Sequence, residues 1–69
     1  MALSARNRLA GTVESVEREG LMAEVAVEVD DGQTVTAVIT ASSAERLGLE
    51  EGEEVSAVVK ATEVMVENR

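Results

Sequence analysis

The alternation of residues between Leu21 and Val29 constrains the fold of this 69-residue chain more than any other feature. Every odd-numbered position in it is apolar, and the positions between them hold Met22, Glu24, Ala26 and Glu28. A period of two residues puts the odd-numbered side chains on one face of a β-strand. The Asp30-Asp31-Gly32 that follows is a strong hairpin signal. We therefore predict a strand that turns back into an antiparallel partner, with these residues inward: Leu21, Ala23, Val25, Val27 and Val29.

Three further segments have strand-like patterns. Residues 9–16 predict a first strand, followed by a turn over residues 17–20. Gly11 in that strand is typical of a bulge or of a close approach by a neighbouring backbone. Residues 34–40 predict the strand after the hairpin, and residues 55–66 predict one long bent strand or two short ones. Leu9, Gly11 and Val13 share one face of the first strand, and in the strand over 34–40 the residues expected inward are Val35, Ala37 and Ile39.

One short helix is predicted between the strand over 34–40 and the strand over 55–66. Ser42 with Glu45 three residues later fits a capping box, in which Ser42 is the N-cap. Gly48 fits a left-handed C-terminal stop. The acidic residues 49–54 lack the ligand spacing of a calcium loop and predict a solvated turn, not a cation site.

These elements together predict an all-β fold, a small five-stranded Greek-key barrel of the oligonucleotide/oligosaccharide-binding type with one short helix. One domain is expected to span residues 1–69. A core this small rarely stabilises a fold alone, and the chain has no Cys or His for a disulfide or a structural zinc site. Residues 55–66 are apolar on both faces, unlike a strand with one solvated face. We therefore expect the second face to meet another subunit in a homo-oligomer.

Charge and composition argue against several functions. The net charge of −8 is opposite to the basic footprint that nucleic acids need, and no aromatic residue is present to stack on bases. Nucleophilic catalysis lacks its usual His or Cys, so an enzyme is not expected. No apolar run is long enough to span a membrane, and the first residues lack a signal-peptide core. These features predict a cytoplasmic protein.

Lys60 is the only lysine of the chain, and it lies within the apolar run 55–66. Such a lysine is often a solvated residue that discourages edge pairing. The alternative is that its ammonium meets an anion, since a cation among apolar residues is otherwise costly.

Polar donors also cluster near the N-terminus, at Ser4, Arg6 and Asn7. They fit either an ordinary polar arm or a site for a tetrahedral dianion, which carries only acceptors and so binds only donors. Ser43, at the predicted helix start, is either a neighbour of the cap or a further donor with a free hydroxyl and N–H.

Four segments in this order make the chain resemble the molbindins, the small stand-alone Mop proteins of the TOBE-like class. The segments are Ser4-Ala5-Arg6-Asn7-Arg8-Leu9, Ala37-Val38-Ile39-Thr40, Leu47-Gly48-Leu49-Glu50-Glu51-Gly52 and Val58-Val59-Lys60-Ala61-Thr62-Glu63-Val64-Met65. The resemblance covers nearly the whole chain. It implies a homohexamer, a trimer of dimers, that holds molybdate or tungstate at subunit interfaces.

The resemblance also implies a set of oxyanion-binding residues. The family's serine and arginine near the start fall on Ser4 and Arg6, with the backbone N–H of Ala5 between them. Its lysine near the end falls on Lys60, and its helix-start serine on Ser43. Ala61 contributes only its backbone, because it replaces a serine found in some relatives. Asn7 also matches the family's pattern, and its role is either to contact the ligand or to brace the strand.

The sequence thus predicts intracellular storage or buffering of molybdate or tungstate. An alternative function is an oligomeric regulatory or interaction module, in which the oxyanion tunes assembly or partner contacts.

Overall fold

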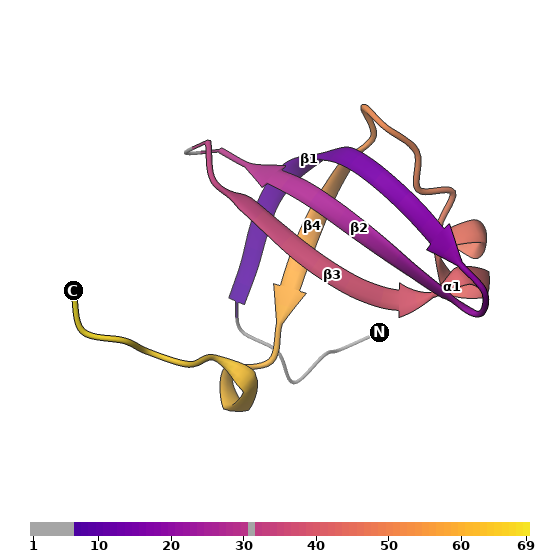
Figure 1. Cartoon of the computed structure of the whole chain (residues 1–69). Coiled ribbons are helices and arrows are strands. Elements are labelled where there is room, and N and C mark those ends of the chain that lie inside the picture. Colours follow the sequence, from indigo (N-terminus) through magenta and orange to yellow (C-terminus); the bar gives the residue numbers. More distant parts are fainter. Residues whose placement is uncertain (1–6, 31) are drawn as a thin grey trace.

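The computed structural model describes residues 7–30 and 32–69, and these residues form a curled antiparallel sheet with one short helix (Figure 1). The strands are β1 (Asn7–Glu19), β2 (Met22–Val29), β3 (Thr34–Thr40) and β4 (Glu54–Val59). The helix α1 (Ala41–Arg46) follows β3, and a 3-10 turn η1 (Ala61–Glu63) follows β4.

The strand order is that of a Greek key, as predicted. Strands β1, β2 and β3 form a meander, and β4 returns to pair with β1, so the order in the sheet is β3-β2-β1-β4. The described residues form four strands, and the outer edges of β3 and β4 are unpaired within them. The sheet is therefore a partly open barrel, with one strand fewer than predicted.

Strand β1 is the element that curls the sheet. Its first half pairs with β4 and its second half with β2. Between Val13 and Ser15 the register with β2 shifts, so Glu14 is an extra residue that bends the strand. The Glu14 carboxylate accepts a 3.1 Å hydrogen bond from the Thr34 hydroxyl. The bulge that the sequence suggested at Gly11 thus lies three residues further along.

Gly11 marks a close backbone approach, the other interpretation of the sequence. It faces Val29 of β2 on one side and Val55 of β4 on the other. A Cβ at Gly11 would collide with the carbonyl oxygen of Glu28 and lie 2.9 Å from Cγ1 of Val27. Only a residue without a side chain fits at this position, where β1 pairs with both β2 and β4.

We expect Gly11→Ala to destabilise the fold by about 1–3 kcal/mol, because the added methyl overpacks against backbone that cannot move aside. Denaturant unfolding at one fixed protein concentration measures this, and Thr12→Ala on the exposed neighbour is the control. A Gly11→Ala protein as stable as the parent would contradict the close approach.

The strands β2 and β3 confirm the predicted hairpin. Gly32 has a φ of 87°, which favours glycine, and its N–H donates to the Val29 carbonyl at 2.9 Å. Ala23, Val25 and Val27 are buried as predicted, and β3 has the predicted bounds. The prediction that Leu21 points inward is wrong, because Leu21 is 86% exposed.

Leu21 is exposed because the first turn is shorter and later than predicted. Glu17 and Arg18 belong to β1, where they pair with β2, and the turn consists of Gly20 and Leu21. Gly20 has a φ of 62°, a conformation that two-residue hairpin loops require.

The helix α1 begins earlier than predicted. Its N-cap is Thr40, whose hydroxyl oxygen accepts a 3.1 Å hydrogen bond from the Ser43 N–H, so the prediction of Ser42 as the cap is wrong. The predicted stop is confirmed: Gly48 has a φ of 64°, and the N–H groups of Gly48 and Leu49 donate to Glu45 and Ala44. This pair of hydrogen bonds is a Schellman motif.

The C-terminal end departs most from the sequence prediction. Residues 55–59 lie in β4, but residues 61–63 form η1 and residues 64–69 have no regular secondary structure and pair with no described strand. An apolar pattern indicates which side chains avoid water. It does not show whether a neighbouring strand is present to form hydrogen bonds with the backbone. Figure 1 shows the yellow C-terminal segment running away from the sheet.

The core is small and lies on the concave face of the sheet. Val13, Val25 and Val27 are its buried centre, and Ile39, Leu49 and Val55 are among the half-buried residues that pack around it. No helix among the described residues is long and apolar enough to cross a membrane.

Candidate functional site

The start of β1 and the end of β4 lie side by side. Asn7 is the register partner of Val59, and its side-chain Nδ2 donates a 3.2 Å hydrogen bond to the Val59 carbonyl. Ser4, Ala5 and Arg6, three predicted site residues, lie outside the described residues. Arg6 precedes Asn7 directly in the sequence, and Lys60 follows Val59. The predicted meeting of the two segments is thus confirmed as far as Asn7 and Val59.

Lys60 is held at its backbone while its side chain remains available. It is an exposed residue, extended with a φ of −66° and a ψ of 133°, and it precedes η1. Its carbonyl accepts a 2.8 Å hydrogen bond from the Glu63 N–H. The Lys60 ammonium makes no ion pair with a carboxylate of the described residues. Ala61, also exposed, is the first residue of η1.

Ser43 is more constrained than the sequence suggested. Its N–H donates to Thr40, so that group is not free for a ligand. Its hydroxyl oxygen accepts a 2.8 Å hydrogen bond from the Thr40 hydroxyl and a 3.2 Å hydrogen bond from Nη2 of Arg46. A hydroxyl that accepts two hydrogen bonds retains one proton to donate. Ser43 can therefore offer an anion its hydroxyl proton.

Within one chain α1, which contains Ser43, lies at a different end of the sheet from the end of β4, which leads into Lys60 (Figure 1). The Ala41 N–H donates to the Leu21 carbonyl at 2.7 Å, which fixes α1 beside the β1–β2 turn. Asn7 and Val59 lie at the other end of β1, which has 13 residues. Because α1 and the end of β4 are well separated in Figure 1, one small ion cannot touch both places in the same chain.

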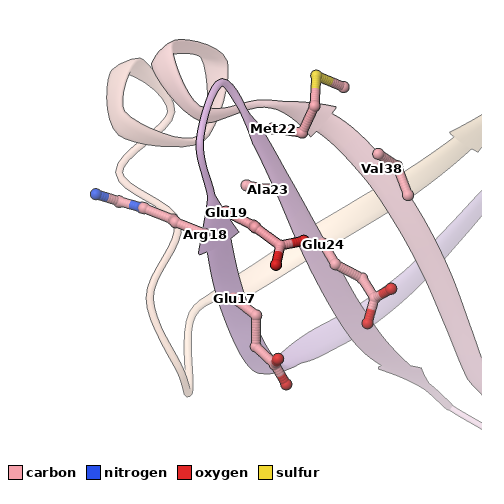
Figure 2. Close-up of a pocket in the computed structure, with 7 residues that line it drawn as sticks. All are labelled: Glu17, Arg18, Glu19, Met22, Ala23, Glu24 and Val38. Carbon is pink, nitrogen blue, oxygen red and sulfur yellow. The ribbon is translucent and has the colours of Figure 1, made fainter.

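A hollow of about 370 Å³ lies on the outer side of β1 and β2, and sequence reasoning did not identify it. Its lining residues are Glu17, Arg18, Glu19, Met22, Ala23, Glu24 and Val38 (Figure 2). Three of these are glutamates, and the Arg18 guanidinium extends away from them toward Glu45, which lies 3.8 Å from it. The excess of negative charge makes this hollow unsuitable for an oxyanion.

A second hollow, of about 430 Å³, opens on the concave face between the edges of β3 and β4. We call it the apolar groove, and its lining is Val13, Val25, Val27, Val35, Ala37, Ile39, Leu47, Leu49, Val55, Ser56, Ala57 and Val58. The same chain carries an apolar tail, in which Val64, Met65 and Val66 are 48%, 91% and 93% exposed. In the apolar groove Leu47 and Val58 are 68% and 42% exposed, while Val13, Val25 and Val27 are buried.

The sequence and the fold both match known proteins. The model of the TOBE domain matches residues 3–66. Molybdenum-pterin-binding protein 3 of Clostridium pasteurianum is 46% identical over 66 residues, which cover 96% of this chain and 97% of that protein.

Two solved structures have the same fold. The molybdate-binding protein from Sporomusa ovata superposes with a TM-score of 0.92 and 37% identity, over 99% of this chain and all of that one. The cytoplasmic molybdate-binding protein ModG, solved with molybdate bound, has a TM-score of 0.84 and 41% identity, over 88% of this chain and 43% of that one.

Proposed function

The chain belongs to the TOBE domain family and, within it, to the molbindins, the small molybdenum-pterin-binding proteins, and from that membership we propose that it binds molybdate or tungstate reversibly. The proposed donors are Lys60, the backbone of Ala61, the segment Ser4-Ala5-Arg6 and the hydroxyl of Ser43. The proposed function is storage or buffering of the oxyanion. The proposed location is the cytoplasm, by analogy with ModG, which is a cytoplasmic molybdate-binding protein.

The observation that carries the proposal is the state of Lys60. Its backbone is anchored on both sides, by Asn7 at Val59 and by Glu63 at Lys60 itself, yet its ammonium has no ion-pair partner in the described residues. A cation whose backbone is anchored beside the start of β1, just after the family's serine and arginine in the sequence, suits a tetrahedral dianion. Every oxygen of such an ion accepts, and every proposed contact donates.

The negative net charge of the protein repels a dianion. The contacts within the site must therefore contribute more binding energy than this repulsion costs. A hexamer would carry six times −8, or −48. The Debye length is about 8 Å at physiological salt, so distant carboxylates are largely screened. Each charge-assisted hydrogen bond contributes roughly 1.5–3 kcal/mol at contact range. A few such bonds are enough to hold the ion in an acidic protein.

Two features support a site shared between copies of the chain. Ser43 and Lys60 lie too far apart in one chain to hold the same ion, so a site that uses both needs two chains. The apolar tail is exposed in one chain, as are Leu47 and Val58 of the apolar groove, and each surface could cover the other between two copies. We propose the homohexamer that the resemblance implied, with tail-to-groove contacts among its interfaces.

The name of the Clostridium pasteurianum relative includes a pterin, which makes a pterin compound a second candidate ligand. The chain contains no Phe, Tyr or Trp on which a pterin ring could stack. The proposed donors match the oxyanion itself, which we therefore favour. A regulatory module, in which the oxyanion tunes assembly, remains the alternative to storage.

Equilibrium dialysis against molybdate, with molybdenum measured by mass spectrometry, tests the proposal. We expect saturable binding that changes little between low and moderate salt, because contacts at hydrogen-bond range outweigh long-range steering. Sodium acetate beside sodium chloride separates screening from direct competition by chloride. Absence of saturable binding would contradict the proposed function, and a steep loss of affinity in both salts would contradict its electrostatic basis.

A further inference from the structure

The Asn7 side chain is hydrogen-bonded to the strand that leads into Lys60. Its Nδ2 lies 3.2 Å from the Val59 carbonyl oxygen and joins positions 52 residues apart in the sequence. Both residues are also opposite each other in the β1–β4 ladder. A side-chain bond added at this position closes the end of the ladder, where strands otherwise fray.

This hydrogen bond fixes the backbone from which the flexible Lys60 side chain extends. Lysine carries a compact charge on four rotatable carbons, so its placement depends on the backbone from which it starts. The carbonyl before Lys60 is held by Asn7, and the carbonyl of Lys60 is held by Glu63. The ammonium makes no ion pair in the described residues.

The amide of Asn7 is committed to Val59 through one of its two side-chain N–H groups. It therefore acts on the backbone of β4, in the role of bracing rather than ligand contact. We propose that Asn7 is a positioning residue, which sets the geometry of the oxyanion site through Lys60 without touching the ion. This inference rests on the proposed function.

A double-mutant cycle of Asn7→Ala and Lys60→Ala tests the inference through molybdate affinity. We expect Asn7→Ala alone to weaken binding by about 3- to 10-fold, the effect of losing one neutral hydrogen bond. In a Lys60→Ala protein the same change should weaken binding less than about twofold, because residues that act through each other are not additive. Equal fold-losses in both backgrounds, or no loss in either, would overturn the inference.

Thr34→Ala is the matched control. It also removes one exposed side-chain hydrogen bond between strands, at 3.1 Å, but far along the sheet near Glu14. We expect its effect on the unfolding midpoint to resemble that of Asn7→Ala, with molybdate affinity unchanged. A loss of affinity in Thr34→Ala equal to that in Asn7→Ala would assign the effect to general stability and overturn the inference.

A second measurement needs no ligand and separates this inference from the proposed function. Lys60 is the only lysine, so protein labelled with ¹⁵N-lysine gives one backbone amide signal. We expect that signal to shift and broaden in Asn7→Ala but not in Thr34→Ala. An unmoved signal would overturn the anchoring role of Asn7. A parent protein that binds no molybdate would instead contradict the proposed function, with the Lys60 signal still deciding whether Asn7 anchors the residue.

Discussion

Lys60→Ala is expected to weaken molybdate binding by about 10- to 150-fold, the equivalent of one charge-assisted hydrogen bond of roughly 1.5–3 kcal/mol. The ammonium is the one lysine charge of the chain, and no carboxylate among the described residues competes for it by ion pairing. The stability of the fold should change little, since Lys60 is exposed and its backbone bond to Glu63 does not need the side chain. Equilibrium dialysis against molybdate measures the change.

Gln33→Glu is the control for the change in net charge. Gln33 is an exposed residue between β2 and β3, and that segment lies away from both α1 and the end of β4 (Figure 1). The substitution makes the net charge more negative by one, as Lys60→Ala does, and we expect less than about a twofold effect because a distant surface charge is screened by salt. An unchanged affinity in Lys60→Ala, or an equal loss in both variants, would remove Lys60 from the site.

Met65→Asp combined with Val66→Asp is expected to dissociate the proposed oligomer. Both side chains are more than nine-tenths exposed in the single chain, and burying each between copies contributes about 1.5–3 kcal/mol. An aspartate buried there without a partner adds a further penalty. Sedimentation velocity should therefore show a shift toward the monomer, together with loss of molybdate binding if the site is shared.

Asn68→Asp combined with Arg69→Gln provides the charge-matched control in the same tail. It makes the net charge more negative by two, as the double aspartate variant does, at two exposed polar positions beyond Val66. We expect this variant to retain the assembly of the parent. If the double variant sediments as the parent does, the tail does not form the interface.

The strands with regular alternation were predictable from the sequence. Strand β3 has the predicted bounds, and in β2 the buried residues Ala23, Val25 and Val27 are those that the period of two selects. Gly48 was predictable because few residues accept its positive φ. In each case a local rule and the tertiary packing favour the same structure.

The errors arise where tertiary contacts choose between local alternatives. Ser42 was predicted as the cap, but Thr40 also carries a hydroxyl, and the hydrogen bond from the Ala41 N–H to Leu21 accompanies a helix that begins after Thr40. The residues 61–66 have a strand-like pattern, but no described strand lies beside them. The number of strands in one chain therefore could not be read from the pattern alone.

The candidate site was predictable in part. The pairing of β1 with β4 confirms that the two segments meet, at Asn7 and Val59. The bracing bond of Asn7 could not be derived from the sequence, because it depends on the register between strands about 50 residues apart. The engagement of Ser43 by Thr40 and Arg46 was missed for a similar reason, since it follows from where the helix begins.

Native mass spectrometry of the parent protein, with and without molybdate, tests the central claim most directly because it gives the number of subunits and of bound ions together. We predict molybdate on a homo-oligomer, six-subunit in the proposed assembly, and none on the free monomer, since the proposed site needs donors from two chains. A spectrum in excess molybdate identical to that of the ligand-free protein, or molybdate bound to the monomer, would contradict it.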